Sequence, residues 1–380
     1  MILKKILIGV TEDWFALSHF KPLMSALRQL APEVVVATRA SGRFAEIEAL
    51  GCRAVAFDFR RSSLNPIIEA DTVRRFAALL RAEQPDAVHL IALKPITLGA
   101  AALLMVPTKP AVGVHLTGIG LLAIAGGAKA RAMRTVALRM MRSLLRRQRS
   151  HLFIENPDDL ATLVQAGADP QGRVTVLGGA GVDPDVFVAQ RAPANAPPVA
   201  AYVGRMIRSK GIEVLVAAAQ RLRAEGGALQ LDLYGRIDAD NPEAISAADM
   251  QRWQASGDLH WHGHVDDVRA IWRTADLFVM PTLGGEGLPR ALLEAAASAR
   301  PSVVTDVPGC RHFVRDGVEG LIVPPGNPEH LAAALSRLVA DPGLRASMGR
   351  AARMRVLDGF TERHVMDAVM AGYRDLARRS

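Results

Sequence analysis

Residues 277–297 have the sequence LFVMPTLGGEGLPRALLEAAA. An apolar run is followed by a glycine-rich loop and then by a segment dominated by alanine and leucine. This order predicts a buried strand, a turn at its carboxyl end and a helix that packs back on the sheet. Parallel sheets are built from such units, because neighbouring parallel strands need a crossover connection. The stretch therefore favours an α/β fold.

The same alternation extends over the chain in both directions. A proline-rich run, VAQRAPANAPPV at 188–199, interrupts it once and is typical of a linker. We therefore expect two Rossmann-like parallel-sheet domains at 1–187 and 199–360, a linker at 188–198, and a C-terminal helix at 361–380 that packs on the first domain. Ligands bind beyond the carboxyl ends of such strands, so two facing domains would form an interdomain cleft. The expected strands are Lys5–Val10, Glu33–Thr38, Arg53–Phe57, Ala87–Leu93, Ala111–Leu116, His151–Ile154, Val174–Leu177, Val199–Val203, Leu229–Tyr234, Leu259–His262, Leu277–Met280, Ser302–Val304 and Leu321–Val323.

The composition excludes several classes of protein. Half of the 380 residues are apolar, which is too many for a disordered chain. Two cysteines, Cys52 and Cys310, exclude a disulfide scaffold. The 46 basic and 38 acidic residues leave a net charge of +8, which points to an anionic partner.

All of that surplus lies in residues 129–149, KARAMRTVALRMMRSLLRRQR, which contain eight basic residues and no acid. Apolar residues recur there at helical spacing, so we expect a basic amphipathic helix on an anionic membrane surface. The alternative is an outer helix with a solvated arginine face. No apolar run reaches the roughly 20 residues of a membrane span. We expect a cytoplasmic protein, peripherally associated with the inner face of the plasma membrane.

Two loops of the second half favour binding of a phosphorylated sugar. Residues 204–211, GRMIRSKG, place Arg205 and Lys210 where a helix begins, which suits phosphate. The alternative for that loop is a solvated basic turn. In 281–297, Glu286 lies in the loop and Glu294 on an apolar helix, where a carboxylate needs donors such as ribose hydroxyls. The alternatives are that Glu286 caps the helix and that Glu294 pairs with an arginine.

Several motifs together resemble one enzyme family. GRMIRSKGI (204–212), GHVDDV (263–268), EGLPRALLEAAA (286–297) and TDVPGCRHFVRDGVEGLIVPPG (305–326) resemble the retaining glycosyltransferases of family 4, which have the GT-B fold. In the first half, VTEDWFALSHFKPL, PDAVHLIALKP, HLTGIG and ENPDDL are similar to the bacterial branch that builds capsule, O-antigen and lipid-linked glycans.

The resemblance implies a role for individual residues. Arg205 and Lys210 would bind the donor diphosphate and stabilise the leaving group, and Glu286 would contact the donor sugar. Other donor contacts would come from Gly287, Leu288 and Pro289 through their backbone, from Glu294 to the ribose, and from His264 and Val265 near the base.

In the first half, the resemblance places His19 beside the acceptor. It also places a catalytic-site histidine near the end of Ala111–Leu116, where His115 is one candidate and Thr117 is the other. Two further positions depart from the family pattern. Thr11-Glu12-Asp13-Trp14 stands where many relatives have a glycine-rich loop, and Tyr234-Gly235-Arg236 replaces Gly-x-Gly.

Other patterns are weaker. Asp183-Pro184-Asp185 and Asp238-Ala239-Asp240 match the three-residue D-x-D metal motif, and His260, His262 and His264 alternate along an expected strand. Such short patterns are frequent by chance, and we expect neither a metal nor another cofactor.

The expected function is transfer of a hexose or N-acetylhexosamine, with retention, from a UDP-sugar to a lipid-linked, polyprenyl diphosphate type of saccharide in surface glycan synthesis. Two alternatives stand beside it. One is another GT-B enzyme, such as a UDP-N-acetylglucosamine 2-epimerase. The other is a non-enzymatic nucleic-acid-binding protein that uses the basic helix, but that segment lacks interleaved aromatics, so we expect no nucleic-acid partner.

Overall fold

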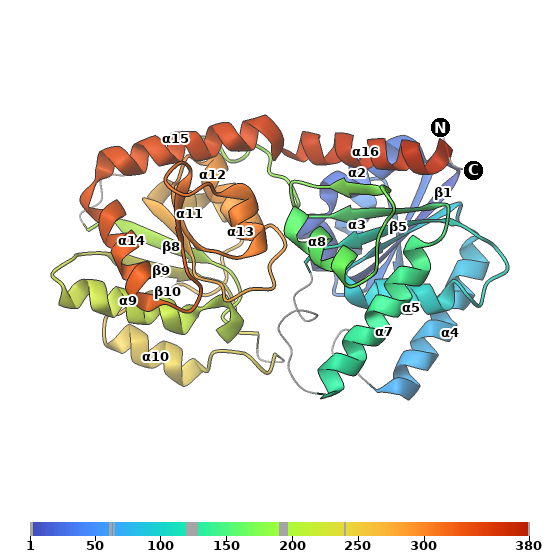
Figure 1. The fold of residues 1–380 in the computed structure, drawn as a ribbon, viewed down its shortest axis with the longest axis horizontal. Coiled ribbons are helices and arrows are strands. Elements are labelled where there is room, and N and C mark those ends of the chain that lie inside the picture. Colours follow the sequence, from blue (N-terminus) through green and yellow to red (C-terminus); the bar gives the residue numbers. More distant parts are fainter. Residues whose placement is uncertain are drawn as a thin grey trace. The chain divides into compact units, whose positions relative to one another are not determined.

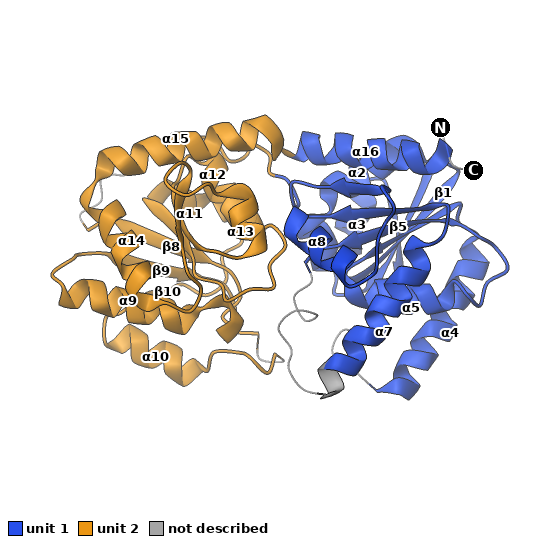
Figure 2. Cartoon of the chain, viewed as in Figure 1, with its two compact units in different colours: residues 1–181, 362–380 blue, residues 182–361 orange. Residues whose placement is uncertain are grey.

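The computed structural model describes residues 3–60, 63, 65–118, 128–189, 197–238 and 241–378, with the backbone alone for 128–130. The chain forms two compact units (Figures 1 and 2). Unit 1 contains residues 1–181 and 362–380, and unit 2 contains residues 182–361.

Unit 1 is built on a parallel sheet of seven strands in the order β3-β2-β1-β4-β5-β6-β7. Buried aliphatic residues dominate the central strands, as expected for a sheet that is covered on both faces. The strands are β1 (Lys5–Glu12), β2 (Glu33–Arg39), β3 (Arg53–Ala56), β4 (Ala87–Ile91), β5 (Ala111–Leu116), β6 (Ser150–Ile154) and β7 (Val174–Val176).

Alternate residues of these strands serve two separate cores. Leu7, Val88 and Val114 point to the helices α4, α5 and α7, whereas Ile6, Ile8 and Val34 point to α1, α2 and α16. Figure 1 shows α16, the last helix of the chain, beside α2. The helices are α1 (Asp13–His19), α2 (Lys21–Leu30), α3 (Phe44–Ala49), α4 (Pro66–Glu83), α5 (Leu93–Ala102), α7 (Ala128–Leu145), α8 (Pro157–Gln165) and α16 (Glu362–Arg378).

Unit 2 repeats the design with six parallel strands in the order β10-β9-β8-β11-β12-β13. The strands are β8 (Val199–Val203), β9 (Gln230–Tyr234), β10 (His260–Trp261), β11 (Leu277–Met280), β12 (Ser302–Thr305) and β13 (Gly320–Val323). The helices are α9 (Ile212–Ala224), α10 (Ala247–Ala255), α11 (Arg269–Thr274), α12 (Arg290–Ala297), α13 (Pro308–Phe313), α14 (Pro328–Ala340) and α15 (Pro342–Gly359).

Three helices differ from the sequence expectation. The spacing of apolar residues over Phe15–Leu30 favours a single helix, but the chain leaves helical geometry at Phe20 and starts again at Lys21. Pro22 in the new first turn explains the break, because it has no N–H for a continuous helix. The basic helix ends at Leu145 rather than at 149. In 277–297 a proline suits the first turn of a helix, which favours a start at Leu288, but α12 begins at Arg290 with Pro289 as its extended N-cap.

The boundary between the units lies earlier than the expected linker. Residues 182–187 belong to unit 2, where Val182 bridges to Thr361 and Phe187 is buried in the core. Most of the expected linker, residues 190–196, lies outside the described residues.

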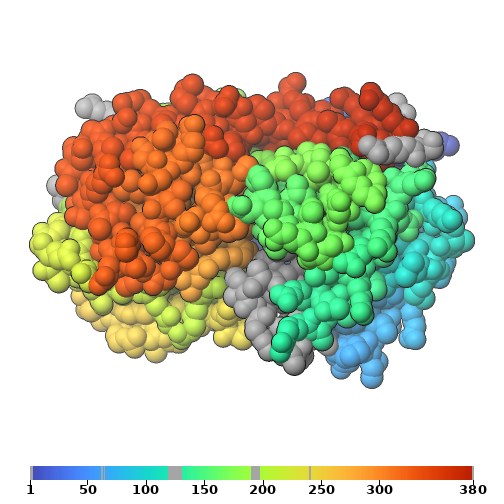
Figure 3. Space-filling view, viewed as in Figure 1, coloured from blue at the N-terminus to red at the C-terminus, as the bar shows by residue number. Residues whose placement is uncertain are grey.

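Helix α7 carries the basic segment along the surface of unit 1 (Figure 3). Ala137, Met141 and Leu144 are buried against the core, and the side chains of Arg131, Arg134 and Arg139 are exposed. Arg142 instead donates to the carbonyl of Ala166 at 2.9 Å. Among the described residues, no helix is both long and apolar enough to cross a bilayer.

Candidate functional site

Loops at the carboxyl edge of the unit 2 sheet pack closely on one another through glycines. Gly211, the N-cap of α9 with φ of 74°, lies so near the carbonyl of Pro281 that a Cβ would be 2.0 Å from it. Gly235 meets the carbonyl of Gly204 in the same way, at 1.8 Å from the position of a Cβ. Larger residues cannot occupy these positions without moving the backbone, so the loops after β8, β9 and β11 have fixed relative positions.

A charge pair at this edge joins Lys210 to Glu286. The Nζ of Lys210 donates to Oε1 of Glu286, and both side chains are mostly shielded, at 17% and 14% exposure. The hydroxyl of Thr282 lies 3.1 Å from the same carboxylate oxygen and 3.2 Å from the carbonyl of Ser209. Glu286 therefore pairs with the basic loop and does not cap α12, whose N-terminus has no side-chain cap.

Arg205 projects from the same basic loop into a more open position. Its guanidinium is paired with Asp238 at 3.0 Å and its side chain remains 41% exposed. The carbonyl of Arg205 accepts from the buried hydroxyl of Tyr202 at 3.1 Å, which holds the backbone in place. A partly exposed guanidinium next to a shielded ammonium can reach a ligand oxygen that Lys210 does not cover.

Glu294 is buried inside α12, as the apolar sequence around it predicts. Its Oε1 accepts from Nε of Arg290 at 2.8 Å, one helical turn earlier. Burial raises the pKa of Glu294, and the charge of Arg290 opposes that shift. The arginine pair considered in the sequence analysis is therefore present, and no hydrogen bond of Oε2 is found among the described contacts.

The three residues after Glu286 were expected to contact the donor through their backbone, but they are shielded from solvent. Gly287, Leu288 and Pro289 are all buried. A Cβ on Gly309, in α13, would be 1.2 Å from the carbonyl of Gly287, so the two backbones touch.

His264 and Val265 follow β10, but the ring that packs at this point is that of His262. His262 stacks on Tyr234 at 4.5 Å between ring centroids, and its Nε2 lies 3.4 Å from Asp232. His264 is exposed and paired with Asp266 at 3.3 Å, and Val265 packs against the unit 2 core. The strand ends at Trp261, so the three alternating histidines do not share one strand face.

In unit 1 the structure separates the two candidates at the end of β5. His115 lies within the strand, is 2% exposed and packs edge-on against Phe20 at 5.1 Å. Thr117 follows the strand directly and is half-buried, so it rather than His115 stands at the carboxyl edge. His19 ends α1 beside Phe20, with its Nδ1 2.7 Å from the hydroxyl of Ser18.

Comparison with known proteins assigns both units to glycosyltransferase families. A model described as "Glycosyl transferase 4-like domain" matches residues 18–180, and one described as "Glycosyl transferases group 1" matches residues 197–341. Together these models cover most of the chain. The chain belongs to glycosyltransferase family 4.

Relatives of this family 4 chain act in bacterial glycan synthesis. It is 25% identical to the N,N'-diacetylbacillosaminyl-diphospho-undecaprenol alpha-1,3-N-acetylgalactosaminyltransferase of Campylobacter jejuni, over 89% of this chain and 90% of that protein. It is 32% identical to the lipopolysaccharide core biosynthesis glycosyltransferase LpsE of Rhizobium meliloti, over 47% of this chain and 50% of that protein.

Solved structures show that the family 4 chain has the GT-B fold. It matches the sucrose-phosphate synthase of Thermosynechococcus elongatus with a TM-score of 0.81, at 20% identity, over 99% of this chain and 100% of that one. It matches the Anabaena protein HepE in complex with UDP and glucose with a TM-score of 0.78, at 17% identity, over 98% and 100% of the two chains.

Sequence reasoning gave no supporting role to three side chains that hold loops or candidate residues in place within their own units. Thr282 supports Glu286, Asp238 neutralises Arg205, and the buried Asp13 accepts from the backbone N–H of Ser41 at 2.7 Å. The only sequence signal for Asp238 was the D-x-D pattern, which was discounted. The second aspartate of that pattern, at 240, lies outside the described residues. No group of three metal-ligating side chains occurs in the part of the chain that the structure describes.

Proposed function

We propose that this enzyme transfers a hexose or N-acetylhexosamine from a UDP-sugar to a lipid-linked saccharide, with retention at the anomeric carbon. The shielded Lys210–Glu286 pair at the carboxyl edge of the unit 2 sheet carries the proposal. Such edges are where parallel α/β sheets bind ligands. The Campylobacter relative is named for an undecaprenol diphosphate substrate, and HepE was solved with UDP and glucose. Both names support the substrate classes.

Lys210 and Arg205 would hold the donor diphosphate. As the bond from the sugar to the diphosphate breaks, negative charge grows on the leaving oxygen. Two fixed cations stabilise that charge, and preorganised groups of this kind contribute strongly to catalysis. The chain itself would thus supply the charge stabilisation that a metal ion supplies elsewhere.

Glu286 would accept hydroxyls of the donor sugar with the oxygen that Lys210 and Thr282 leave open. Retention follows if the acceptor hydroxyl attacks from the face that the diphosphate leaves. In that step the new C–O bond forms as the old one breaks, and the hydroxyl proton passes to the departing phosphate oxygen. No covalent intermediate on the protein is required.

Other donor contacts would come from the same edge. Glu294 would offer Oε2 to the ribose hydroxyls while Arg290 holds Oε1. His264 and Val265 would lie near the base, together with the Tyr234–His262 stack. Gly287, Leu288 and Pro289 would line the sugar through backbone atoms.

Unit 1 would supply the acceptor side. Thr117, at the carboxyl end of β5, and His19 would face the acceptor, and His115 would support them from beneath through Phe20. Helix α7 would rest on an anionic inner membrane surface, where a polyprenyl diphosphate acceptor is anchored.

A donor screen tests the proposal. Purified protein is incubated with single nucleotide sugars and a membrane lipid extract, and the nucleotide released is measured. We expect acceptor-dependent release of UDP from one hexose or N-acetylhexosamine donor, with the α-anomer formed from an α-linked donor. Release of UDP without any glycolipid product would contradict a transferase, and an inverted product would contradict retention.

A further inference from the structure

A second hollow lies at the opposite, amino-terminal edge of the unit 1 sheet. Segments that lead into β1, β4, β5 and β6 surround it, and its volume is about 410 Å³. Small-ligand sites typically enclose roughly 300–1,000 Å³. We call it the basal pocket, and its polar lining residues are Lys4, Gln84, Asp86, Thr108, Lys109 and Arg149.

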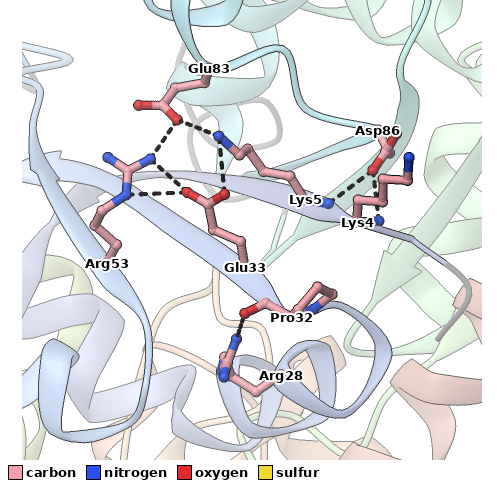
Figure 4. A network of polar contacts seen from close by, with 8 residues as sticks. All are labelled: Lys4, Lys5, Arg28, Pro32, Glu33, Arg53, Glu83 and Asp86. Atoms are coloured by element: carbon pink, nitrogen blue, oxygen red, sulfur yellow. Dashed lines mark hydrogen bonds and ion pairs between the residues drawn. The ribbon is translucent and has the colours of Figure 1, made fainter.

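The lining of the basal pocket has more positive than negative charge. Lys4, Lys109 and Arg149 face a single carboxylate, Asp86. That carboxylate is already engaged, because its Oδ2 accepts from the backbone N–H groups of Lys4 at 2.7 Å and Lys5 at 2.9 Å (Figure 4).

By contrast, two neighbouring cations at the same edge have carboxylate partners. Lys5 and Arg53 share Glu33 and Glu83 in one network of ion pairs (Figure 4). Among the described residues, neither of the lysine side chains of the basal pocket nor Arg149 has a carboxylate partner.

Arg149 is the most constrained of these cations. Its Nε is shielded from solvent and finds no acceptor among the described residues. The partly exposed remainder of its guanidinium is the part that can meet a ligand in the basal pocket. A planar guanidinium can donate to two oxygens of one anion.

We propose that the basal pocket binds a phosphate group. Arg149 would bind two phosphate oxygens, Lys4 and Lys109 would add charge, and the Thr108 hydroxyl would donate a hydrogen bond. The segment between α5 and β5, which contains Thr108 and Lys109, also exposes the apolar side chains of Leu104 (73%) and Met105 (43%). A phosphate in a lipid headgroup therefore fits as well as a free one.

Equilibrium dialysis with radiolabelled inorganic phosphate tests the site. All proteins carry Lys210→Ala, so that phosphate held at the proposed donor site does not contribute. We expect saturable binding that weakens at least tenfold in Lys109→Ala/Arg149→Gln and persists in the charge-matched Lys21→Ala/Arg146→Gln. Lys4→Ala, an exposed change, should weaken binding less. Equal binding in the two double variants, or no saturable binding in the parent, would overturn the proposal.

Vesicles then identify the source of the phosphate. Phosphatidylglycerol vesicles that displace the bound phosphate, while phosphatidylcholine vesicles do not, would assign a lipid headgroup. Displacement by neither would assign a soluble phosphate. Because the donor screen requires Lys210 and the dialysis removes it, failure of the basal pocket and failure of the proposed function are distinguishable.

Discussion

Lys210 and Glu286 are 76 residues apart in the sequence, and their side chains form an ion pair. Without a donor, the pairing keeps two shielded charges neutralised, which a buried lysine or carboxylate needs. A bound donor would offer each residue a substitute, phosphate for Lys210 and sugar hydroxyls for Glu286. The pair thus holds both side chains in place before the donor binds, and neither charge is left unpaired.

Removing either member should therefore impair transfer. We expect Lys210→Ala and Glu286→Gln each to lower kcat/KM by about 10²–10³, the usual loss when one preorganised charge-stabilising group is deleted. The measurement is the initial rate of nucleotide release with the preferred donor.

Arg208→Ala is the matched control, because this exposed cation of the same loop pairs with Glu213 instead. It should retain near-normal turnover. Near-normal turnover in Lys210→Ala would contradict the placement of the donor diphosphate.

The buried histidine His115 should make the stability of unit 1 depend on pH. Burial lowers the pKa of His115 to about 3. The folded ring then stays neutral between pH 6.5 and 3 while the unfolded ring takes up a proton. Stability is therefore complete above the usual histidine pKa and is lost as the pH falls through this window.

For His115 alone this effect amounts to about 2 kcal/mol between pH 7 and pH 5. We expect His115→Gln to remove that part of the pH dependence, as measured by urea unfolding at the two pH values. His330→Gln, which removes an exposed histidine, should behave as the parent protein does. An unchanged pH dependence in His115→Gln would show that the ring is protonated in the folded state.

Among the elements, α16 is the one that returns to unit 1 from the far end of the sequence. Its Tyr373 hydroxyl lies 2.8 Å from Nδ1 of His89, whose Nε2 lies 3.2 Å from Nδ1 of His115. Tyr373 is buried, so a chain of hydrogen bonds joins the helix to β4 and β5.

Tyr373→Phe should destabilise unit 1 by about 1–3 kcal/mol, because it leaves a buried imidazole nitrogen unsatisfied. Arg363→Ala breaks an exposed ion pair with Asp367 on the same helix and should cost less than about 0.5 kcal/mol. Urea unfolding followed by far-UV circular dichroism compares the two. Equal losses would mean that the hydroxyl contributes nothing beyond helix packing.

Helix α7 is the element proposed to meet the membrane. We expect Arg131→Gln/Arg134→Gln/Arg139→Gln to weaken binding to anionic vesicles by about 10², at about 1 kcal/mol for each arginine. Arg337→Gln/Arg350→Gln/Arg378→Gln removes the same charge from other exposed positions and should bind as the parent does.

Turnover of the α7 variant on a soluble acceptor should be retained, since none of the three side chains lies at the proposed donor site. Unchanged vesicle binding would remove the membrane role of α7 and leave the solvated outer helix as its interpretation.

For the whole molecule, the net charge of +8 describes one segment rather than a general property. Residues 129–149 carry the surplus, and the remainder of the chain is balanced. Arg205 and Lys210 belong to that balanced part, where Asp238 and Glu286 offset them. The excess charge therefore concerns the proposed membrane surface, and the donor would be held by locally paired cations.

Because the proposed charge stabilisation comes from the chain, chelation should leave transfer intact. We expect rates with EDTA within about twofold of those with Mg²⁺, since the cations that replace a metal are covalently part of the enzyme. Loss of activity in EDTA that Mg²⁺ or Mn²⁺ restores would contradict this and would direct attention to Asp238.

The local sequence pattern was sufficient to predict most strands and helices and their order along the chain. Apolar runs such as 87–91 and 277–280 must be buried on both faces, and glycine and proline end them wherever the backbone has to turn. The local pattern did not predict the break at Phe20 or the start of α12 at Arg290, because a proline near a helix start is compatible with more than one boundary.

Only the tertiary structure decided which side chains pair with one another. The sequence showed that Glu286, Glu294, Arg205 and Lys210 belong to loops and helices at one strand edge. It did not show that Lys210 meets Glu286, that Arg290 holds Glu294, or that His115 is buried within β5 while Thr117 follows the strand. Hydrogen bonds act over about 3 Å, and only the folded sheet brings residues from distant loops within that distance.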